Sequence, residues 1–406
     1  MLLNKILLIT IDILINFCYK YIGGIMSTKS FKIKDIFADH WDAFVSEGYP
    51  IRSVVFKNVN KIISCGNPSL GYSLYFCDYC DEFKYVPFTC KSRFCNSCGA
   101  KYIQDRAASI SSKMIRCTHR HIVFTIPEEL RIFFRKDRSL LNLLFEASAQ
   151  TIFNWFYKLN KSENFKPGFI STLHTFGRDL KWNPHIHMLL TEGASGIKTV
   201  WRKIKHIPFN MLRKRWQATI LSFLHHKLGP SFYKLKSYLF KAYPDGFYVY
   251  AKPNMNSKSI DSVKYIIRYT GRPAMAQSRI IDYDGEFVTF YYDRHEDNKR
   301  VTEKIHAFEF IKRLIIHIPD EQFKMIRYYG LYAKEYTHSS KLILLDSIEK
   351  RKLRKKLSHW RARILLSFGI DPLLCSCGTK MELVEIFYSG KNLSLDNSPS
   401  YLYNSS

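Results

Sequence analysis

Residues 178–190 read RDLKWNPHIHMLL, with His185 and His187 on either side of a single isoleucine. Side chains along a β-strand alternate between the two faces of a sheet, so residues two apart point the same way. The apolar run after His187 predicts a strand, and both imidazoles then lie on one face of it. Such a pair can bind a divalent ion. The pattern alone still favours ordinary core or surface histidines, because H-x-H is short and common.

The segments around this stretch predict an antiparallel sheet flanked by helices. GFISTLHTFG, residues 168–177, alternates like a strand, stops at a glycine, and would form a hairpin with HIHMLL. Other predicted strands and helices follow from apolar periodicity and turn residues. They are a strand and then a helix in 119–134, helices in 31–63, 139–158 and 211–229, a strand in 246–252, and a hairpin in 278–295 around Asp284 and Gly285. The fold class is therefore α+β.

Six of the ten cysteines fall between Cys65 and Cys98, which favours metal binding over disulfides in a chain without a clear secretion signal. Cys77 and Cys80 form one C-x2-C pair, Cys95 and Cys98 form a second, and fourteen residues separate the pairs. This spacing predicts that the four thiolates share one structural zinc ion.

Cys65 and Cys90 remain over within the same region. With a histidine such as His40 or His119 they would form a second zinc site, but they are equally compatible with buried core positions. Near the C-terminus, Cys375 and Cys377 have the wrong separation for a standard zinc knuckle, and no second pair follows them. The sequence does not favour a metal site there.

The charge of the chain points to a polyanionic partner. Lys and Arg number 62 against 35 acidic residues, which gives a net charge of +27. This excess is well above the roughly 2–8 charges that solubility requires of a small domain, so nucleic acid is the expected partner. Three basic runs could follow a phosphate backbone, although such runs are often only solvated faces: 202–205, 213–215 and 350–363.

The first 25 residues are predicted to be an extension outside the fold. Their apolar run, Ile6 to Cys18, is interrupted by Asp12 and Asn16 and is shorter than the roughly 20 residues that a membrane span needs. No small-residue cleavage site follows it. We therefore expect no membrane association, and a bacterial-type cytoplasmic protein associated with the nucleoid.

A tyrosine pair in VKYIIRYTG could act together with the two histidines. Tyr265 and Tyr269 are one helical turn apart and share a helix face, with Arg268 between them in sequence. A phenol is a weak nucleophile near neutral pH, but a metal ion that polarises a phosphodiester would help it to attack phosphorus. Two packing tyrosines in a chain with 26 of them are the simpler interpretation of the spacing alone.

The order of these motifs resembles that of the HUH endonucleases, a superfamily of replication initiators, relaxases and some transposases. The matching motifs are Phe124–Thr125, His185 with His187, and the Tyr-x-x-basic-Tyr helix. With the preceding cysteine module, the chain is similar to the rolling-circle transposases of the insertion sequence 91 family. The longer matching phrases are CKSRFCNSCGAKY, HIVFTIPEELR, LHTFGRDLKWNPHIHML and YIIRYTGRPAMAQSRI.

This resemblance implies an HUH-type antiparallel sheet that carries the metal-binding histidines, with a helix that presents the tyrosines beside them. His185 and His187 would bind Mg or Mn, with His174 on the neighbouring strand as the third ligand or as an ordinary hydrogen-bonded histidine. Tyr265 and Tyr269 would be the nucleophiles. Arg268 would contact the phosphate or the departing oxygen, or would face solvent.

The expected domains follow from the same reading. They are an extension in 1–25, a helical and zinc-binding domain in 26–118, the catalytic domain in 119–318, and a basic, mostly helical region with a disordered tail in 319–406. The expected partner is single-stranded DNA at element ends, with homo-oligomerisation left open. Two alternatives remain: a plasmid replication initiator or relaxase with the same chemistry, and a zinc-dependent DNA-binding regulator without catalysis.

Overall fold

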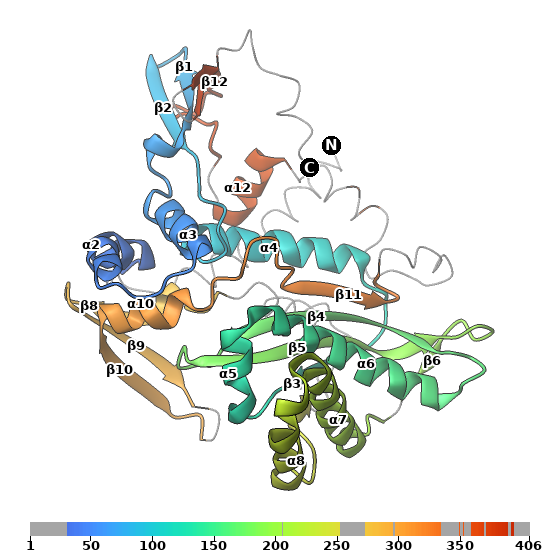
Figure 1. Ribbon diagram of the computed structural model, residues 1–406. Coiled ribbons are helices and arrows are strands. Elements are labelled where there is room, and N and C mark those ends of the chain that lie inside the picture. The colour runs from blue at the N-terminus through green and yellow to red at the C-terminus, as the bar shows by residue number, and fades with distance from the viewer. Residues whose placement is uncertain are drawn as a thin grey trace.

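A computed structural model shows how these segments are arranged (Figure 1). The structure describes residues 31–204, 206–251, 273–294, 297–333, 349, 352, 359–368, 371–388 and 391–393. The predicted N-terminal extension and the segment with Tyr265, Arg268 and Tyr269 lie outside the described residues.

A six-stranded antiparallel sheet forms the centre of the molecule, in the order β11-β4-β5-β3-β7, with β6 paired to β5. The strands are β3 (His119–Phe124), β4 (Lys166–Phe176), β5 (Trp182–Ser195), β6 (Arg202–Lys203), β7 (Val249–Ala251) and β11 (Ile326–Gly330). The predicted hairpin is present as β4 and β5, which are the two longest strands of the sheet. The α+β class is confirmed.

One face of this sheet is covered by helices. Ile186, Met188 and Leu190 of β5 are buried in the largest apolar core together with Trp216 of α7. Alternation along β5 explains this, since its even-numbered residues all point to the same side. The covering helices are α5 (Glu128–Lys136), α6 (Leu141–Leu159), α7 (Phe209–Leu228) and α8 (Tyr233–Ala242). They lie below the sheet in Figure 1.

The long helix α4 (Asn96–Lys113) lies across the opposite face. Near its end, Ile110 and Met114 pack against Ile170 of β4 and Leu189 of β5. Leu189 is an odd-numbered residue of β5, as are His185 and His187. The face of the sheet that carries His185 and His187 is therefore partly covered by α4. Helices α5 to α8 cover the opposite face.

A second core joins the N-terminal helices to a three-stranded sheet. Trp41, Phe44 and Val59 pack with Phe290 and Phe310 in this core. Its elements are α2 (Ile33–Ser46), α3 (Ser53–Ile63), β8 (Ile280–Tyr283), β9 (Phe287–Asp293), β10 (Arg300–His306) and α10 (Ala307–Ile315). The predicted Asp284-Gly285 turn does connect β8 to β9. Gly285 has a φ of +97°, which favours glycine there.

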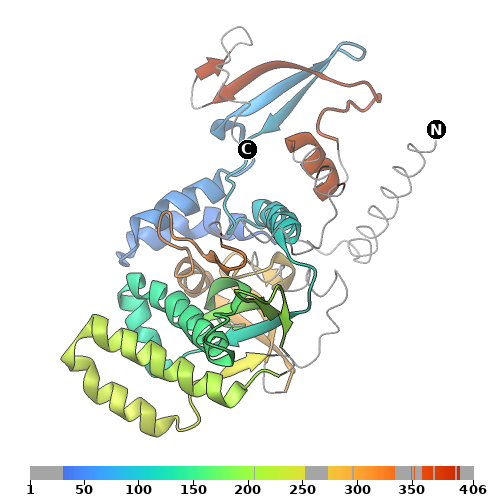
Figure 2. The ribbon, with the colours of Figure 1, turned by 90° about the vertical axis from the view of Figure 1, so that its right-hand side faces the viewer.

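A separate four-stranded sheet, with the order β13-β12-β1-β2, combines segments that are far apart in sequence (Figure 2). Its strands are β1 (Tyr72–Cys77), β2 (Glu82–Pro87), β12 (Glu382–Tyr388) and β13 (Lys391–Leu393), and α12 (Trp360–Phe368) lies beneath it. The C-terminal region thus contributes strands as well as helix, and β11, beyond the expected boundary at 318, belongs to the central sheet. Short 3-10 helices occupy Pro68–Leu70, Arg138–Leu140, Pro230–Phe232 and Gln277–Arg279.

Among the described residues, no helix combines the length and the apolar character required to cross a bilayer.

Candidate functional site

Three histidines meet on the α4 side of the central sheet. His174 lies directly opposite His185 in the ladder between β4 and β5, and His187 is two residues further along β5. One ring nitrogen of each histidine lies within 4.8 Å of those of the other two. Strand alternation and antiparallel register are the cause, since they place cross-strand partners on the same face.

Hydrogen bonds hold the two β5 imidazoles in fixed orientations. His185 Nδ1 lies 2.7 Å from the carbonyl oxygen of Asn183 and must donate its proton there. His187 Nδ1 lies 2.8 Å from His121 Nε2, on the neighbouring strand β3. The ε nitrogens of His185 and His187 then face each other at 2.9 Å. Metal-binding histidines usually have their second nitrogen hydrogen-bonded in this way.

These distances fit a divalent ion. Metal–nitrogen bonds of about 2.1 Å place two neighbouring ligands of an octahedral ion about 3 Å apart, close to the separation of the two ε nitrogens. The third imidazole, His174, is buried, and its ring centre lies 4.4 Å from that of His187. Three histidines on one side of an ion leave other coordination positions for substrate oxygens.

His121 was not singled out from the sequence. Burial, together with the neighbouring His185, lowers the pKa of His121 to about 4. His121 is therefore neutral at pH 7 and able to accept a hydrogen bond from His187. The signal that could have found it is the stretch HRHIVF, which repeats the H-x-H pattern on an adjacent predicted strand.

A buried hydroxyl next to the histidines also favours a bound group. Thr172 is paired directly with His187, so its side chain lies on the same face. Its Oγ1 is buried and has no hydrogen-bond partner among the described residues. Buried hydroxyls normally have a partner, often an ordered water. A metal-bound water in this position would satisfy Thr172.

Four cysteines form a compact cluster at the start of α4: Cys65, Cys90, Cys95 and Cys98. The sulfur of Cys98 lies 3.7 Å from that of Cys65 and 3.6 Å from that of Cys90. Zn–S bonds of about 2.3 Å in a tetrahedron place the sulfurs about 3.8 Å apart. Hydrogen bonds from Cys90 and Cys95 lower the pKa of Cys98, which favours the thiolate that zinc requires.

The predicted grouping of the cysteines is wrong. Cys95 and Cys98 join Cys65 and Cys90, whereas Cys77 and Cys80 belong to another cluster with Cys375 and Cys377. Residues 78–81 form the turn between β1 and β2, which carries the first pair away from α4. The spacing of the cysteines along the chain cannot reveal that the two pairs belong to different clusters.

Neither histidine considered for the second zinc site contributes to it. His119 is buried and lies 2.6 Å from the hydroxyl of Tyr332 and 3.0 Å from the carbonyl of Cys117. His40 lies 2.8 Å from the carbonyl of Gly285. Two further cysteines take the place of a histidine in the cluster.

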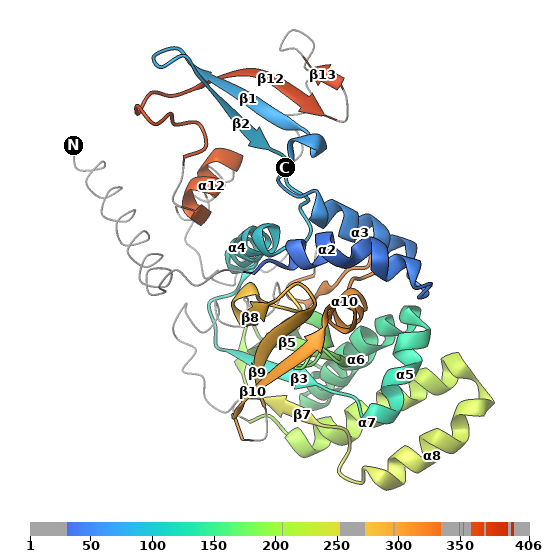
Figure 3. The same ribbon diagram turned by 90° about the vertical axis from the view of Figure 1, so that its left-hand side faces the viewer.

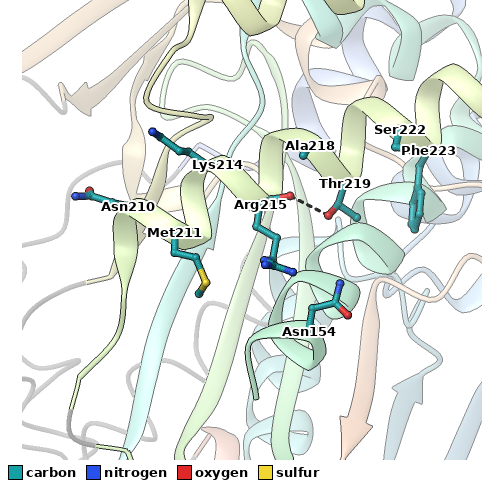
Figure 4. A pocket seen from close by; sticks show the side chains of 9 residues that line it. All are labelled: Asn154, Asn210, Met211, Lys214, Arg215, Ala218, Thr219, Ser222 and Phe223. Carbon is teal, nitrogen blue, oxygen red and sulfur yellow. Dashed lines mark hydrogen bonds between the residues drawn. The ribbon is translucent and has the colours of Figure 1, made fainter. Parts of the chain in front are cut away.

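A hollow with a volume of about 760 Å³ lies along α7 and α6 (Figure 4). Lys214 and Arg215, from one of the predicted basic runs, line it with Asn154 and Thr219. These helices cover the face of the sheet opposite to the histidines. The hollow is therefore not part of the histidine site.

Comparisons with known proteins show that the chain is similar to transposases. Residues 36–126 match the model of a transposase zinc-binding domain, and residues 168–340 match that of a putative transposase family. The transposase for insertion sequence element IS801 of Pseudomonas savastanoi pv. phaseolicola is 27% identical over 374 residues, which cover 86% of this chain and 88% of that protein. Putative transposase y4qJ of Sinorhizobium fredii is 26% identical over 329 residues, 75% of this chain and 81% of that protein. No solved structure matches the chain.

Proposed function

This chain is a transposase of the insertion sequence 91 family, and we propose that it nicks and rejoins single-stranded DNA through a 5′-phosphotyrosine intermediate, moving its element by a rolling-circle mechanism. The observation that carries this proposal is the cluster of His174, His185 and His187 on one face of the central sheet. Three histidines placed in this way can hold a divalent ion, and such an ion assists cleavage of a phosphodiester.

The histidines would hold Mg or Mn at the scissile phosphate. When bound, the ion polarises the phosphodiester and offsets the charge that develops on it. The carbonyl of Asn183 and the ring of His121 keep the imidazoles of His185 and His187 turned towards that position. The site is thus organised before DNA arrives, which reduces the cost of reaching the transition state.

Tyr265 and Tyr269 are the proposed nucleophiles. The phenolic oxygen bonds to phosphorus, the bond to the 3′ oxygen breaks, and that oxygen leaves with a proton as a free 3′-OH. Attack of a 3′-OH on the phosphotyrosine reverses the step and rejoins a strand. Both tyrosines follow β7, which pairs with β3, the strand that carries His121. Arg268 would contact the phosphate.

A stacking surface beside the histidine face supports a single-stranded substrate. Tyr248 and Tyr250 are both exposed, and their rings are nearly parallel with centres 6.3 Å apart. Tyr250 is paired with Val123, whose side chain lies on the same face as that of His187. The guanidinium of Arg213 lies 5.7 Å from the ring of Tyr248. Exposed aromatics next to a cation are typical of surfaces that bind unpaired bases.

The decisive experiment is an adduct assay. Wild-type protein incubated with single-stranded element ends and Mg or Mn should yield a covalent protein–DNA species that resists denaturation. Tyr265→Phe with Tyr269→Phe should abolish it, whereas Tyr238→Phe on α8 should not. Adducts that persist in the double variant would disprove the nucleophile assignment. DNA binding without any adduct would favour a non-catalytic regulator.

The same assay separates transposition from related activities. A replication initiator or relaxase would form the adduct preferentially on a plasmid origin or transfer origin, whereas the proposed function requires the ends of the element. Association with chromosomal DNA in the cytoplasm follows from this function, and cross-linking of the DNA-bound protein would test whether it acts as a homo-oligomer.

A further inference from the structure

A second cysteine cluster joins two segments that are far apart in the sequence. Its members are Cys77, Cys80, Cys375 and Cys377, and their sulfurs all lie within 4.8 Å of one another. We infer that this cluster is a second structural zinc site, which holds the C-terminal segment 371–388 against the N-terminal hairpin of β1 and β2. The matched zinc-binding domain ends at residue 126 and the matched transposase family at residue 340, so neither contains the C-terminal pair.

The sulfur positions fit a tetrahedral ion and do not fit disulfides. Cys77 Sγ lies 3.7 Å from Cys377 Sγ, and Cys375 Sγ lies 4.0 Å from Cys80 Sγ. A disulfide requires about 2.05 Å, whereas four thiolates around zinc are separated by about 3.8 Å. All four residues are free cysteines.

The backbone presents each pair on a tight turn. The N–H of Asp81 donates to the carbonyl of Cys77 at 2.9 Å, and the N–H of Gly378 donates to that of Cys375 at 3.0 Å. The turns meet because β12 pairs with β1, with Phe76 opposite Glu382. The C-x-C pair, whose spacing argued against a knuckle, therefore forms a turn of its own, with Gly378 at a φ of +88°.

The four-stranded sheet of β1, β2, β12 and β13 needs additional stabilisation because its apolar core is very small. Within the described residues, the buried apolar cluster of this sheet consists of four residues, Tyr75, Cys77, Cys375 and Met381, and Leu74 of β1 is buried outside that cluster. Sheets of this size bury too little apolar surface to remain folded alone, and a bound metal commonly compensates. Two of these four buried residues are the proposed ligands themselves.

Charge around the cluster also favours a cation. Residues 72–87 and 371–388 contain six acidic side chains and two lysines, in a chain of strongly positive net charge. Glu82 Oε2 lies 3.7 Å from Cys375 Sγ. Thiolates beside carboxylates repel each other unless a positive ion lies between them. A zinc ion removes that repulsion.

The cluster also positions the basic C-terminal segment. Arg361 of α12 makes two hydrogen bonds to the carboxylate of Asp371, at 2.8 and 2.6 Å, and Asp371 accepts from the N–H of Leu373 just before the C-terminal pair. Paired arginine–carboxylate contacts are geometrically specific. The end of the basic run 350–363, which lies in α12, is thus connected to the segment that carries the C-terminal cysteine pair. Figure 3 shows α12 beneath the four-stranded sheet.

Zinc content of the full chain tests the inference. For the metal count, every protein carries His174→Ala, His185→Ala and His187→Ala, because the three histidines could also bind zinc. The otherwise wild-type protein, purified with Zn²⁺ under reducing conditions, should contain two ions per chain by mass spectrometry of the metal. Cys375→Ser with Cys377→Ser should contain one, and Ser376→Ala, between the two ligands, should retain two. Trypsin should then cut residues 350–388 faster in the double variant only. The adduct assay on the same double variant, with its three histidines intact, separately tests whether the proposed tyrosine site is still active.

A separate variant guards against global misfolding. Cys65→Ser with Cys98→Ser should also contain one ion, and Co²⁺ loaded into either double variant should show the absorption of a four-thiolate site at half the wild-type intensity. Two ions in the Cys375/Cys377 double variant would overturn the inference, as would one ion in the otherwise wild-type protein. A Cys77–Cys377 disulfide in protein isolated without reductant from a reducing cytosol would also overturn it.

Discussion

His121 Nε2 and His187 Nδ1 lie 2.8 Å apart across the pairing of β3 with β5, with their rings nearly parallel. A metal ion on His187 Nε2 requires the proton on Nδ1, so His121 must accept it. The depressed pKa of His121 keeps its ring neutral and able to do so. We therefore propose that His121 is a positioning residue for His187, one of the three histidines proposed to bind the ion.

His121→Phe should weaken binding of Mn²⁺ by roughly 10- to 100-fold, the usual effect of losing a hydrogen-bond partner of a metal ligand. Cleavage should recover at high Mn²⁺, because the ligands remain. His121→Gln, which retains an acceptor, should restore much of the affinity, and His226→Gln on the exposed side of α7 should change nothing. Calorimetric Mn²⁺ titration measures this. Loss of cleavage that no Mn²⁺ concentration restores would contradict a positioning role.

The histidine face could be predicted because it depends on local rules. Alternation in β4 and β5 and the short turn between them place His174 opposite His185 without knowledge of the rest of the fold. The second H-x-H stretch, with His121, obeys the same rule, but its role depends on β3 pairing with β5. That pairing joins strands separated by three helical segments.

The cysteine partition could not be predicted for a related reason. Spacing along the chain indicates which residues form a turn, but not which turns meet. Cys77 meets Cys377 because β12 adds to β1 across 300 residues of sequence. Nothing local to either pair encodes that contact.

His174→Ala should reduce cleavage by roughly 100-fold or more, as expected when a group that stabilises transition-state charge is lost, with little change in DNA affinity. A ligand and a merely structural histidine differ in how they tolerate replacement. His174→Asp can still bind the ion and should recover part of the activity in Mn²⁺, whereas His174→Phe should not. Single-turnover cleavage alongside a gel-shift measurement gives both quantities. Equal activity of the Asp and Phe variants would argue against a ligand.

Tyr248→Ala with Tyr250→Ala should weaken binding of single-stranded DNA by about 1–3 kcal/mol for each base that no longer stacks. Duplex binding should change much less, since paired bases offer no free face. Tyr238→Ala, an equally exposed tyrosine on α8, is the matched control. Fluorescence anisotropy with single- and double-stranded oligonucleotides at one fixed salt concentration makes the comparison. An equal loss of affinity for single- and double-stranded DNA would show that the two tyrosines do not act by stacking on unpaired bases.

His317 should make the fold sensitive to acid. It is buried, its Nε2 lies 2.9 Å from the carbonyl of Leu180, and burial with the nearby Arg138 and Arg93 lowers its pKa to about 3. The unfolded chain takes up the proton near pH 6.5, but the folded protein does not until about pH 3. Stability should therefore fall as pH decreases through this window. Each pH unit contributes about 1.4 kcal/mol.

His317→Gln isolates this contribution, because glutamine keeps a donor for the Leu180 carbonyl without a titrating ring. Urea unfolding of both proteins at pH 7, 6 and 5 should show a smaller loss of stability in the variant. Other acid-sensitive groups, including the zinc thiolates, affect both proteins alike. Identical pH dependence would mean that His317 is protonated as easily in the folded state as in the unfolded one.

Removal of zinc should weaken the attachment of α4 to the rest of the protein, and with it the packing of α4 on the histidine face of the sheet. The zinc concerned is that of the cluster formed by Cys65, Cys90, Cys95 and Cys98. Cys95 and Cys98 lie at the first turn of this helix, and Ile110 and Met114 near its other end pack on the sheet. Structural zinc contributes directly to folding energy. Cys98→Ser should therefore expose residues 65–98 to protease and lower the unfolding temperature. Cys117→Ser, a free cysteine outside both clusters, should retain wild-type zinc and stability. An unchanged protease pattern after verified zinc loss would show that apolar packing alone holds α4 in place.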